Sequence, residues 1–262
     1  MDLSILTEQV KNLTKEVGEF IRGEALVFDR NKVEYKGLND MVSYVDKTAE
    51  TYLVTGLSKL IPIAGFITEE NTNNTVGESY NWIIDPLDGT TNFIHGIPTY
   101  SISIALQHKG ELELGVVYEI NRDECFSAWK DGGAFLNGES IKVSQESNVQ
   151  NTLIATGFPY YDFQKQENYM KLLNELMQNC HGLRRIGSAA VDLAYVACGR
   201  FDAFFEYNLN SWDVAAGIVL VREAGGEVVD FAGSNEAISK RELLATNGKI
   251  SKELLKSIKN YF

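Results

Sequence analysis

Trp82-Ile-Ile-Asp-Pro-Leu-Asp-Gly-Thr-Thr-Asn-Phe93 is the stretch from which both the fold and a candidate site can be worked out. An apolar run typical of a β-strand ends at Asp85, a proline turn brings in Asp88, and a Gly-Thr-Thr step follows. Two neighbouring carboxylates can hold a hard cation. The backbone N–H groups after Gly89 can hold an anion if a helical turn begins there. The segment therefore predicts metal-assisted chemistry on a phosphate.

A plainer interpretation of the same segment also exists. Asp-Pro-Leu-Asp-Gly is good turn chemistry by itself, and Thr90 could serve only as a cap for the turn. The apolar lead-in and the Gly-Thr-Thr tail together favour the functional interpretation.

Further acids stand where other predicted elements begin or end. Glu69 and Glu70 follow the apolar run 66–68, and Asp213 opens the apolar stretch Trp212-Asp-Val-Ala-Ala-Gly217. Converging carboxylates repel one another unless a cation lies between them, so we expect these acids to meet around Mg²⁺. Each of these acids also has a purely structural interpretation. Glu69 and Glu70 could belong to a solvated loop, and Asp213 could stabilise the N-terminus of a helix.

Other phosphate and metal chemistries fit the sequence less well. Haloacid-dehalogenase-type phosphatases place Asp-x-Asp-Gly-Thr after a strand, whereas here the spacing is Asp-x-x-Asp-Gly-Thr. The longer spacing favours two metal ligands over a nucleophile and an acid. A P-loop is absent from the sequence, and no histidine or cysteine spacing suits zinc. His95, close to the motif, is expected to pack or to bond within the turn.

Size and charge narrow the class of protein. The chain has 262 residues and a net charge of −12, which argues against nucleic acid or an anionic membrane as a partner. Cys125, Cys180 and Cys198 form no disulfide framework and predict reduced thiols. The N-terminal stretch does not resemble a leader peptide, and no run is long enough to span a membrane, so a cytoplasmic location is expected.

Hydrophobic periodicity predicts a meander followed by a mixed α/β half. Helices are expected over 3–23 and 43–60, with a hairpin or loop over 29–40 between them. Apolar strands are predicted at 66–68 and 82–84, and the turn Lys109-Gly110 joins two strands of an antiparallel meander. The predicted strands of the meander are 101–106, 112–116 and 124–129. After a switch near 144–151, strands are expected at 153–156, 183–186, 202–206, 227–231 and 243–246, and helices at 163–179, 189–198, 214–224 and 251–261.

Three separated blocks of this sequence resemble the inositol monophosphatase family. They are the pair Glu69-Glu70, the segment Asp85-Pro-Leu-Asp-Gly-Thr-Thr-Asn-Phe93, and Trp212-Asp-Val-Ala-Ala-Gly217. The similarity extends to Lys36 with the residues up to Asp46, and to the Gly-Ser-Ala-Ala-Val-Asp-Leu-Ala segment from Gly187. The resemblance implies an α+β fold, a layered αβαβα sandwich of the inositol monophosphatase and fructose-1,6-bisphosphatase type. It also implies a single domain over 1–262, with halves of about 1–147 and 148–262, and a homodimer.

The resemblance further implies a role for each site residue. Glu69, Asp85 and the Leu87 carbonyl would hold a first Mg²⁺, and Asp85, Asp88 and Asp213 a second. A third, weaker ion would use Glu69 and water. Thr90, supported by Asp46, would orient the attacking water, and Glu69 is also expected to be catalytic. The region of Gly89, Thr90 and Thr91 would bind the phosphate, with Lys36 nearby. Asp88 would contact the substrate, and Ala189 and Glu206 would contact its alcohol portion.

The expected activity is hydrolysis of a small polyol or sugar phosphate, inositol 1-phosphate foremost, by a metal-activated water and with inhibition by lithium. Fructose 1,6-bisphosphate, histidinol phosphate and 3′-phosphoadenosine 5′-phosphate are alternative substrates. A non-catalytic metal- or phosphate-sensing protein is a further alternative. Arg184 and Arg185 could assist an anionic substrate or form a surface ion pair, and Asn210 stands where some animal members carry histidine.

Overall fold

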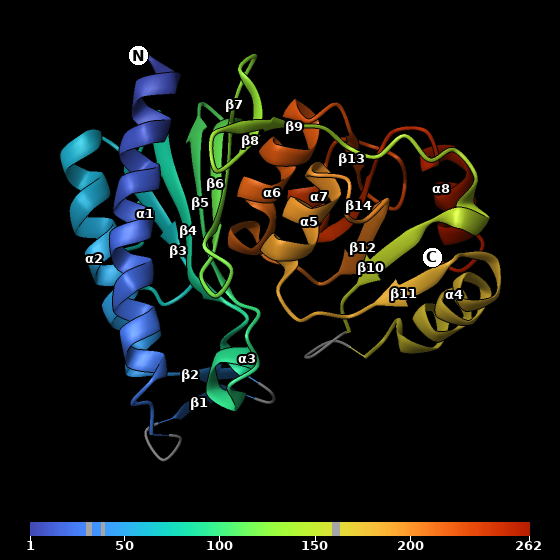
Figure 1. Cartoon of the computed structure of the whole chain (residues 1–262), viewed down its shortest axis with the longest axis horizontal. Helices are drawn as coiled ribbons and strands as arrows, with labels where there is room; N and C mark the ends of the chain where they lie inside the picture. Colours follow the sequence, from blue (N-terminus) through green and yellow to red (C-terminus); the bar gives the residue numbers. More distant parts are fainter. Residues whose placement is uncertain (30–32, 38–39, 159–162) are drawn as a thin grey trace.

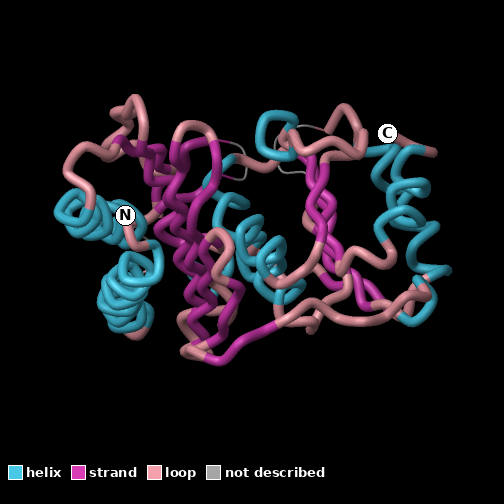
Figure 2. Tube along the Cα trace, turned by 90° about the horizontal axis from the view of Figure 1, so that it is seen from above, coloured by secondary structure: helices cyan, strands magenta, loops and turns pink. Residues whose placement is uncertain are grey.

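Paired helices and β-sheets alternate across the computed structural model (Figures 1 and 2). The structure describes residues 1–29, 33–37, 40–158 and 163–262, and only the backbone of residues 34–37, 40 and 41. The successive layers are helices α1 (Leu3–Ala25) and α2 (Tyr44–Leu60), a seven-stranded sheet, helices α5 (Ala189–Ala197) and α6 (Ser211–Glu223), a five-stranded sheet, and helices α4 (Gln166–Asn179) and α8 (Ser251–Lys259). The predicted αβαβα sandwich is therefore confirmed.

The first helical layer follows the predicted apolar spacing. Helix α1 buries Leu6, Val10, Val17 and Ile21 against α2 and the sheet. The predicted end at Gly23 is wrong, because the helix runs on to Ala25. A single glycine costs a helix only about 1 kcal/mol, which packing offsets.

The seven-stranded sheet has the order β3-β4-β5-β6-β7-β8-β9. Strand β3 lies parallel to β4, and all later neighbours are antiparallel, as the predicted meander requires. Lys109 and Gly110 both have positive φ in the predicted tight turn. The two short last strands were not predicted. The strands are β3 (Gly65–Thr68), β4 (Tyr80–Asp88), β5 (Ser101–His108), β6 (Glu111–Glu119), β7 (Glu124–Trp129), β8 (Gly133–Leu136) and β9 (Glu139–Ile141).

Two small elements lie near the end of β4. The antiparallel strands β1 (Glu34–Gly37) and β2 (Asp40–Val42) form the hairpin that was one of two expectations for this region. Helix α3 (Thr90–His95) begins directly after the Asp-Gly step and contacts β2. Figure 1 shows both at one end of the seven-stranded sheet.

The five-stranded sheet has the order β11-β10-β12-β14-β13, with β10 parallel to β11 and β12 and the other pairs antiparallel. Helix α6 begins at Ser211, three residues before its predicted start, which places Asp213 inside its first turn. The strands are β10 (Leu153–Thr156), β11 (Gly182–Arg184), β12 (Ala203–Tyr207), β13 (Glu227–Val229) and β14 (Glu242–Thr246). The 3₁₀ turn Val149–Asn151 and the short helix α7 (Ala237–Lys240) were not predicted.

The middle helices are apolar on every side because each lies between two sheets. Helix α6 contacts β5, β6 and β7 on one face and β13 and β14 on the other. Residues 214–221 of this helix are all buried. Since the chain crosses from one sheet to the other between Ile141 and Leu153, residues from both halves face this layer.

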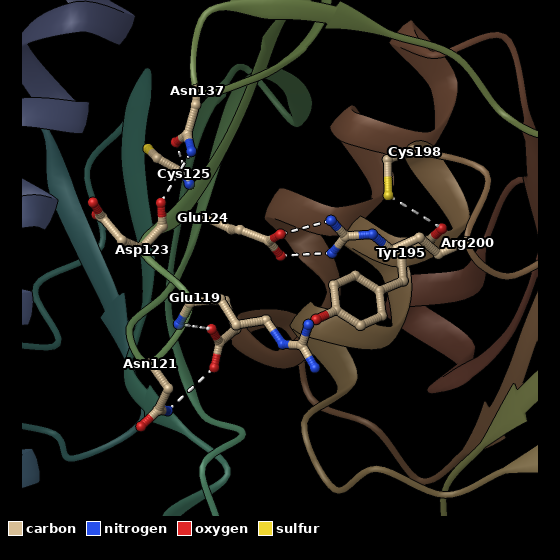
Figure 3. A network of polar contacts seen from close by, with 10 residues as sticks. Glu119, Asn121, Asp123, Glu124, Cys125, Asn137, Tyr195, Cys198 and Arg200 are labelled. Atoms are coloured by element: carbon tan, nitrogen blue, oxygen red, sulfur yellow. Dashed lines mark hydrogen bonds and ion pairs between the residues drawn. The ribbon is translucent and has the colours of Figure 1, made fainter.

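An ion pair fixes the end of α5 against the seven-stranded sheet (Figure 3). The two terminal guanidinium nitrogens of Arg200, just after α5, donate to the two carboxylate oxygens of Glu124 on β7, both at 2.6 Å. The same guanidinium lies over the ring of Tyr195, with Cζ 4.7 Å from the ring centroid. Bidentate pairing gives this contact a defined geometry.

The three cysteines are free, as predicted, with Cys125 buried in the sheet. Across the described residues, no helix combines the length and apolar character that crossing a membrane requires.

Candidate active site

A pocket opens where β4, α3, α5, α6 and β12 approach one another. Of the residues predicted for the site, all but two line this pocket: Glu69, Asp85, Leu87, Asp88, Gly89, Thr90, Thr91, Ala189, Glu206 and Asp213. Asp46 lies directly behind Thr90. Lys36 belongs to strand β1, but its side chain lies outside the described part of the chain.

A bulge in β4 determines how the two aspartates of the motif face. Asp85 pairs with Ser103 on β5, and Asp88 pairs with Ser101, so three steps on β4 match two on its neighbour. In a regular strand, residues three apart point to opposite faces. The extra residue restores the alternation and puts both carboxylates on the face toward α5 and α6. This feature was not predicted from the sequence.

Asp88 is held by the start of α5. One carboxylate oxygen, Oδ2, accepts hydrogen bonds from the Ser188 hydroxyl and the Ala190 backbone N–H, both at 2.7 Å. Burial raises the pKa of Asp88 to about 6, although these two hydrogen bonds and the charge of Arg185 act to lower it. The carboxylate therefore has one oxygen fixed by the protein and the other available to a ligand.

Asp213 reaches the pocket from the first turn of α6. Its Oδ2 accepts a hydrogen bond from the backbone N–H of Asn210 at 2.6 Å, as part of a capping box. Asp213 therefore stabilises the N-terminus of α6, as the alternative interpretation expected, and also lines the pocket. Burial, followed by the charge of Asp88, raises the pKa of Asp213 to about 7. Asn210 also lines the pocket.

Like charges meet at Asp85. Glu69 follows β3, and its backbone N–H donates to the Ile84 carbonyl, which brings it beside the end of β4. Burial raises the pKa of Asp85 well above its ordinary value, and the charges of Glu69, Asp88 and Asp213 raise it further. Four of the five acids that the sequence predicted to converge therefore act on one another electrostatically, whereas Glu70 is not among the residues that line the pocket.

This donor set suits a hard divalent cation. Carboxylates and a carbonyl are the oxygen ligands of Mg²⁺, which usually keeps several waters and binds substrate phosphate rather than an all-protein cage. Within the described ranges, no three His, Cys, Asp or Glu side chains stand close enough together to hold a metal ion by themselves, so Mg²⁺ here would need water and phosphate oxygens as further ligands. A divalent cation would also remove the repulsion that raises the pKa of Asp85.

Thr90 on the pocket lining pairs with the buried Asp46 behind it. The Thr90 hydroxyl oxygen lies 2.9 Å from Oδ1 of Asp46 and 3.0 Å from the Leu87 carbonyl oxygen, two acceptors for its one hydrogen. The other oxygen, Oδ2, accepts the Ser43 hydroxyl at 2.6 Å and the Ser43 backbone N–H at 2.9 Å. Burial raises the pKa of Asp46, and these hydrogen bonds partly offset the rise. The Thr90 oxygen keeps lone pairs for a further donor.

The helical turn needed for anion binding begins where the sequence predicted it. Gly89 precedes α3 with φ of 96°, a left-handed conformation that suits glycine. A Cβ at this position would lie 3.1 Å from the Thr99 carbonyl oxygen. The free N–H groups of the first turn follow directly.

Several pocket residues were missed or left open by the sequence analysis. Asp192, in the first turn of α5, also lines the pocket; the signal was a lone carboxylate in an apolar helix. Arg185 lines the pocket, whereas Arg184 is exposed and bonds to a backbone carbonyl. His95 is exposed at the end of α3, so the expectation that it packs is wrong.

Glu50 is a second missed acid, one helical turn after Asp46 on α2. It is fully buried and accepts the backbone N–H of Glu70 at 2.8 Å. It also accepts the backbone N–H and the hydroxyl of Thr72, at 2.8 and 2.7 Å. Glu50 therefore fixes the loop that carries Glu69, and Glu70 is part of that loop rather than a pocket residue.

Comparison with known proteins gives consistent matches. The model of the inositol monophosphatase family matches residues 2–261. The chain is 43% identical to the Nus factor SuhB of Pseudomonas aeruginosa over 249 residues, 93% of this chain and 92% of that one. It is 42% identical to an inositol-1-monophosphatase of Mesorhizobium japonicum over 230 residues, 87% and 86% of the two chains. A solved IMPase of Thermotoga maritima superposes with a TM-score of 0.90 at 34% identity, covering 100% of this chain and 98% of that one.

Proposed function

Because this chain belongs to the inositol monophosphatase family, we propose that it is a Mg²⁺-dependent phosphomonoesterase of small polyol or sugar phosphates, inositol 1-phosphate foremost. The observation that carries the proposal is the meeting of Glu69, Asp85, Asp88 and Asp213 in one pocket beside the start of α3. Membership of the family supports a phosphatase activity. The identity of the metal, Mg²⁺, and of the substrate is what we propose beyond it.

The acids would hold two to three Mg²⁺ ions. Glu69, Asp85 and the Leu87 carbonyl would bind the first ion, and Asp85, Asp88 and Asp213 the second, with a weaker third at Glu69. Bound ions would supply charge neutralisation for the phosphate and a lowered pKa for water. In a chain of net charge −12, this local positive charge would be needed to attract a phosphate ester.

The chain's own residues would orient the reaction. Since the one hydrogen of the Thr90 hydroxyl is taken up by Asp46 or the Leu87 carbonyl, the hydroxyl oxygen would accept a proton of the attacking water and aim it at phosphorus. Glu69 would help to take up the proton. The backbone N–H groups at Gly89, Thr90 and Thr91 would bind phosphate oxygens at the start of α3. Lys36 would lie near the phosphate, and Ala189 and Glu206 would contact the alcohol.

A covalent route through Asp85 is less well supported. Asp85 is buried, and its Oδ1 already accepts the Leu87 backbone N–H at 2.9 Å. The bulge turns Asp85 and Asp88 to the same face, which suits shared ligation. We therefore expect direct attack by water and no aspartyl-phosphate intermediate.

The partners we propose are a small phosphate ester and a second copy of the chain, without nucleic acid or membrane, in the cytoplasm and with sensitivity to lithium. The Pseudomonas relative is named a Nus factor. We retain the enzymatic proposal because each predicted carboxylate ligand is present in the pocket.

Release of inorganic phosphate from a substrate panel tests the proposal. Inositol 1-phosphate should be hydrolysed only with Mg²⁺, faster than fructose 1,6-bisphosphate, histidinol phosphate or 3′-phosphoadenosine 5′-phosphate. Acid quenching should trap no phosphorylated protein. Failure to release phosphate from any member of the panel would reject the enzymatic proposal, and a phosphorylated Asp85 would reject the mechanism.

Replacing Glu50 should weaken Mg²⁺ use without touching the pocket. In Glu50→Gln, an amide N–H₂ faces backbone donors that a carboxylate now satisfies, so the loop bearing Glu69 loosens. We expect the Mg²⁺ concentration for half-maximal turnover to rise roughly 10- to 100-fold, the usual effect of losing support behind a metal ligand. Glu16→Gln, at an exposed site on α1, is the control. Unchanged Mg²⁺ dependence in Glu50→Gln would contradict this role.

A further inference from the structure

One buried amide, that of Asn92, joins the two halves of the chain next to the pocket. Asn92 lies in α3, directly after Thr91, and is only 5% exposed. Its Nδ2 donates to the Thr99 carbonyl at 2.7 Å and to the Ile186 carbonyl at 2.8 Å. Thr99 precedes β5 in the first half, whereas Ile186 lies between β11 and α5 in the second. An amide nitrogen has two hydrogens, so each half of the chain receives one.

The loop that receives the second hydrogen bond carries part of the pocket. Residues 185–188 lie between β11 and α5 and belong to neither strand nor helix. Arg185 and Ser188 line the pocket, and the Ser188 hydroxyl donates to Asp88. Because no helix or ladder fixes this loop, its place depends on individual contacts. The hydrogen bond to the Ile186 carbonyl lies in the middle of the loop.

Glycines allow both loops to approach α3 closely. A Cβ added at Gly187, where φ is 94°, would lie 2.9 Å from Nδ2 of Asn92. A Cβ added at Gly89 would lie 3.1 Å from the Thr99 carbonyl oxygen and 3.2 Å from that of Gly187. The start of α3 is therefore packed between the two loops that Asn92 connects.

The residues just before Asn92 are those that the proposed function assigns to the phosphate. Gly89, Thr90 and Thr91 all line the pocket. Hydrogen bonds weaken steeply when donor and acceptor are misaligned. A displacement of about 1 Å in a reacting group can lower the rate roughly 100-fold. The start of α3 must therefore be held accurately relative to Asp88, which the start of α5 fixes.

We propose that Asn92 is a positioning residue for the reaction. By bonding Thr99 and Ile186, it holds the start of α3 at a fixed place relative to the start of α5, and so keeps the groups that face the phosphate aligned with Asp88. This inference rests on the proposed phosphatase function. Asn92 itself touches neither the ions nor the substrate in this role.

Removing the amide should weaken phosphate binding. In Asn92→Ala both carbonyls lose their donor, and the start of α3 can shift. At saturating Mg²⁺, the dissociation constant of inorganic phosphate, measured by calorimetry, should rise roughly 10- to 100-fold, the range for losing one hydrogen bond to a charged group. KM for inositol 1-phosphate should rise similarly, and kcat should fall. In the metal-free protein, amide hydrogens of residues 89–95 should exchange faster.

Asn247 supplies a matched control. It is 3% exposed, and its Nδ2 donates to the Ser144 hydroxyl and to the Glu146 carbonyl, both at 2.8 Å. None of these three residues lines the pocket. Asn247→Ala should therefore lower Tm as Asn92→Ala does, while the phosphate dissociation constant and KM stay within about twofold of the wild type. A purely structural role of Asn92 would give this same result.

A second variant covers the case in which Asn92→Ala fails to fold. Asn92→Ser keeps a hydroxyl donor on a shorter side chain, which can satisfy at most one of the two carbonyls. It should still raise the phosphate dissociation constant, by no more than Asn92→Ala does. Circular dichroism melts establish that each variant is folded at the temperature of the titration.

Weaker phosphate binding in the Asn92 variants, with normal binding in Asn247→Ala, would support the positioning role. An unchanged phosphate dissociation constant in a folded Asn92 variant would overturn it. An equal rise in Asn247→Ala would also overturn it, because the rise would then follow from lost stability. A wild-type protein that binds phosphate with Mg²⁺ but hydrolyses no ester would reject the phosphatase proposal instead, and the phosphate titration would still decide whether Asn92 positions α3.

Discussion

Asp213→Asn and Asp88→Asn should each lower Mg²⁺-dependent phosphate release by at least about 10³-fold, the scale expected when a group central to the reaction is lost. Both acids line the pocket from different elements and raise the pKa of Asp85 through their charge. An asparagine there can offer only a neutral oxygen to Mg²⁺, which prefers carboxylates.

The fold should survive both changes. Asparagine at position 213 can still accept the Asn210 backbone N–H through its side-chain oxygen. It also removes one of the charges that repel Asp85, so the metal-free protein should melt no lower than the wild type near neutral pH.

Circular dichroism melts and phosphate release check this expectation together. Glu223→Gln is a matched control, because Glu223 lies at the other end of α6 and accepts the backbone N–H groups of Asp131 and Gly133. It should stay active. Substantial turnover in both Asp88→Asn and Asp213→Asn would remove the basis for the metal assignment.

Thermal stability of the metal-free protein should fall as the pH rises from about 5 to about 8, and Mg²⁺ should reverse the fall. The pKa of Asp88 is raised to about 6 and that of Asp213 to about 7. At pH values between about 4, the ordinary pKa of a carboxyl group, and these raised pKa values, the folded state binds more protons than the unfolded state. This contribution is therefore complete at low pH and is lost as the pH rises through about 6 to 7.

Protons and Mg²⁺ compete for the same oxygens, so the stabilisation by Mg²⁺ should grow with pH. At a free concentration 100 times the dissociation constant, binding adds about 2.7 kcal/mol. That is a rise in Tm of about 5–10 °C for a chain of this length. Melts with Mg²⁺ or a chelator, near pH 5 and near pH 8, measure the difference. An equal rise in Tm with Mg²⁺ at both pH values would contradict the expectation. In Asp213→Asn, the rise in Tm with Mg²⁺ should be smaller than in the wild type.

The elements most readily predicted were those with long regular patterns. Helix α1 and the meander repeat their apolar residues over several turns or alternations. Strands β8 and β9 and helix α7 are too short for a period to stand out. Two helix ends differ from the predicted ones by a few residues: α1 continues past Gly23 to Ala25, and α6 begins at its Asn210–Asp213 capping box.

The acids of the site were predictable because they stand at the ends of apolar runs. Their arrangement was not: the bulge between Asp85 and Asp88 depends on pairing with β5, which no local pattern encodes. Glu50 and Asp192 were missed for a related reason. In the sequence, each looks like an ordinary residue of a helix. Glu50 gains its hydrogen-bond partners only because α2 packs against the loop after β3, and Asp192 reaches the pocket only because α5 packs against β12.

The place of α6 in the middle layer has a consequence for how the protein is made. Glu69, Asp85 and Asp88 are synthesised early and in close succession, whereas Asp213 follows 125 residues after Asp88. A nascent chain that has completed only the seven-stranded sheet thus carries an acidic cluster with its last carboxylate missing and one face of the sheet bare. The pocket takes shape only when α6 docks, so a chain terminated before α6 lacks an assembled site.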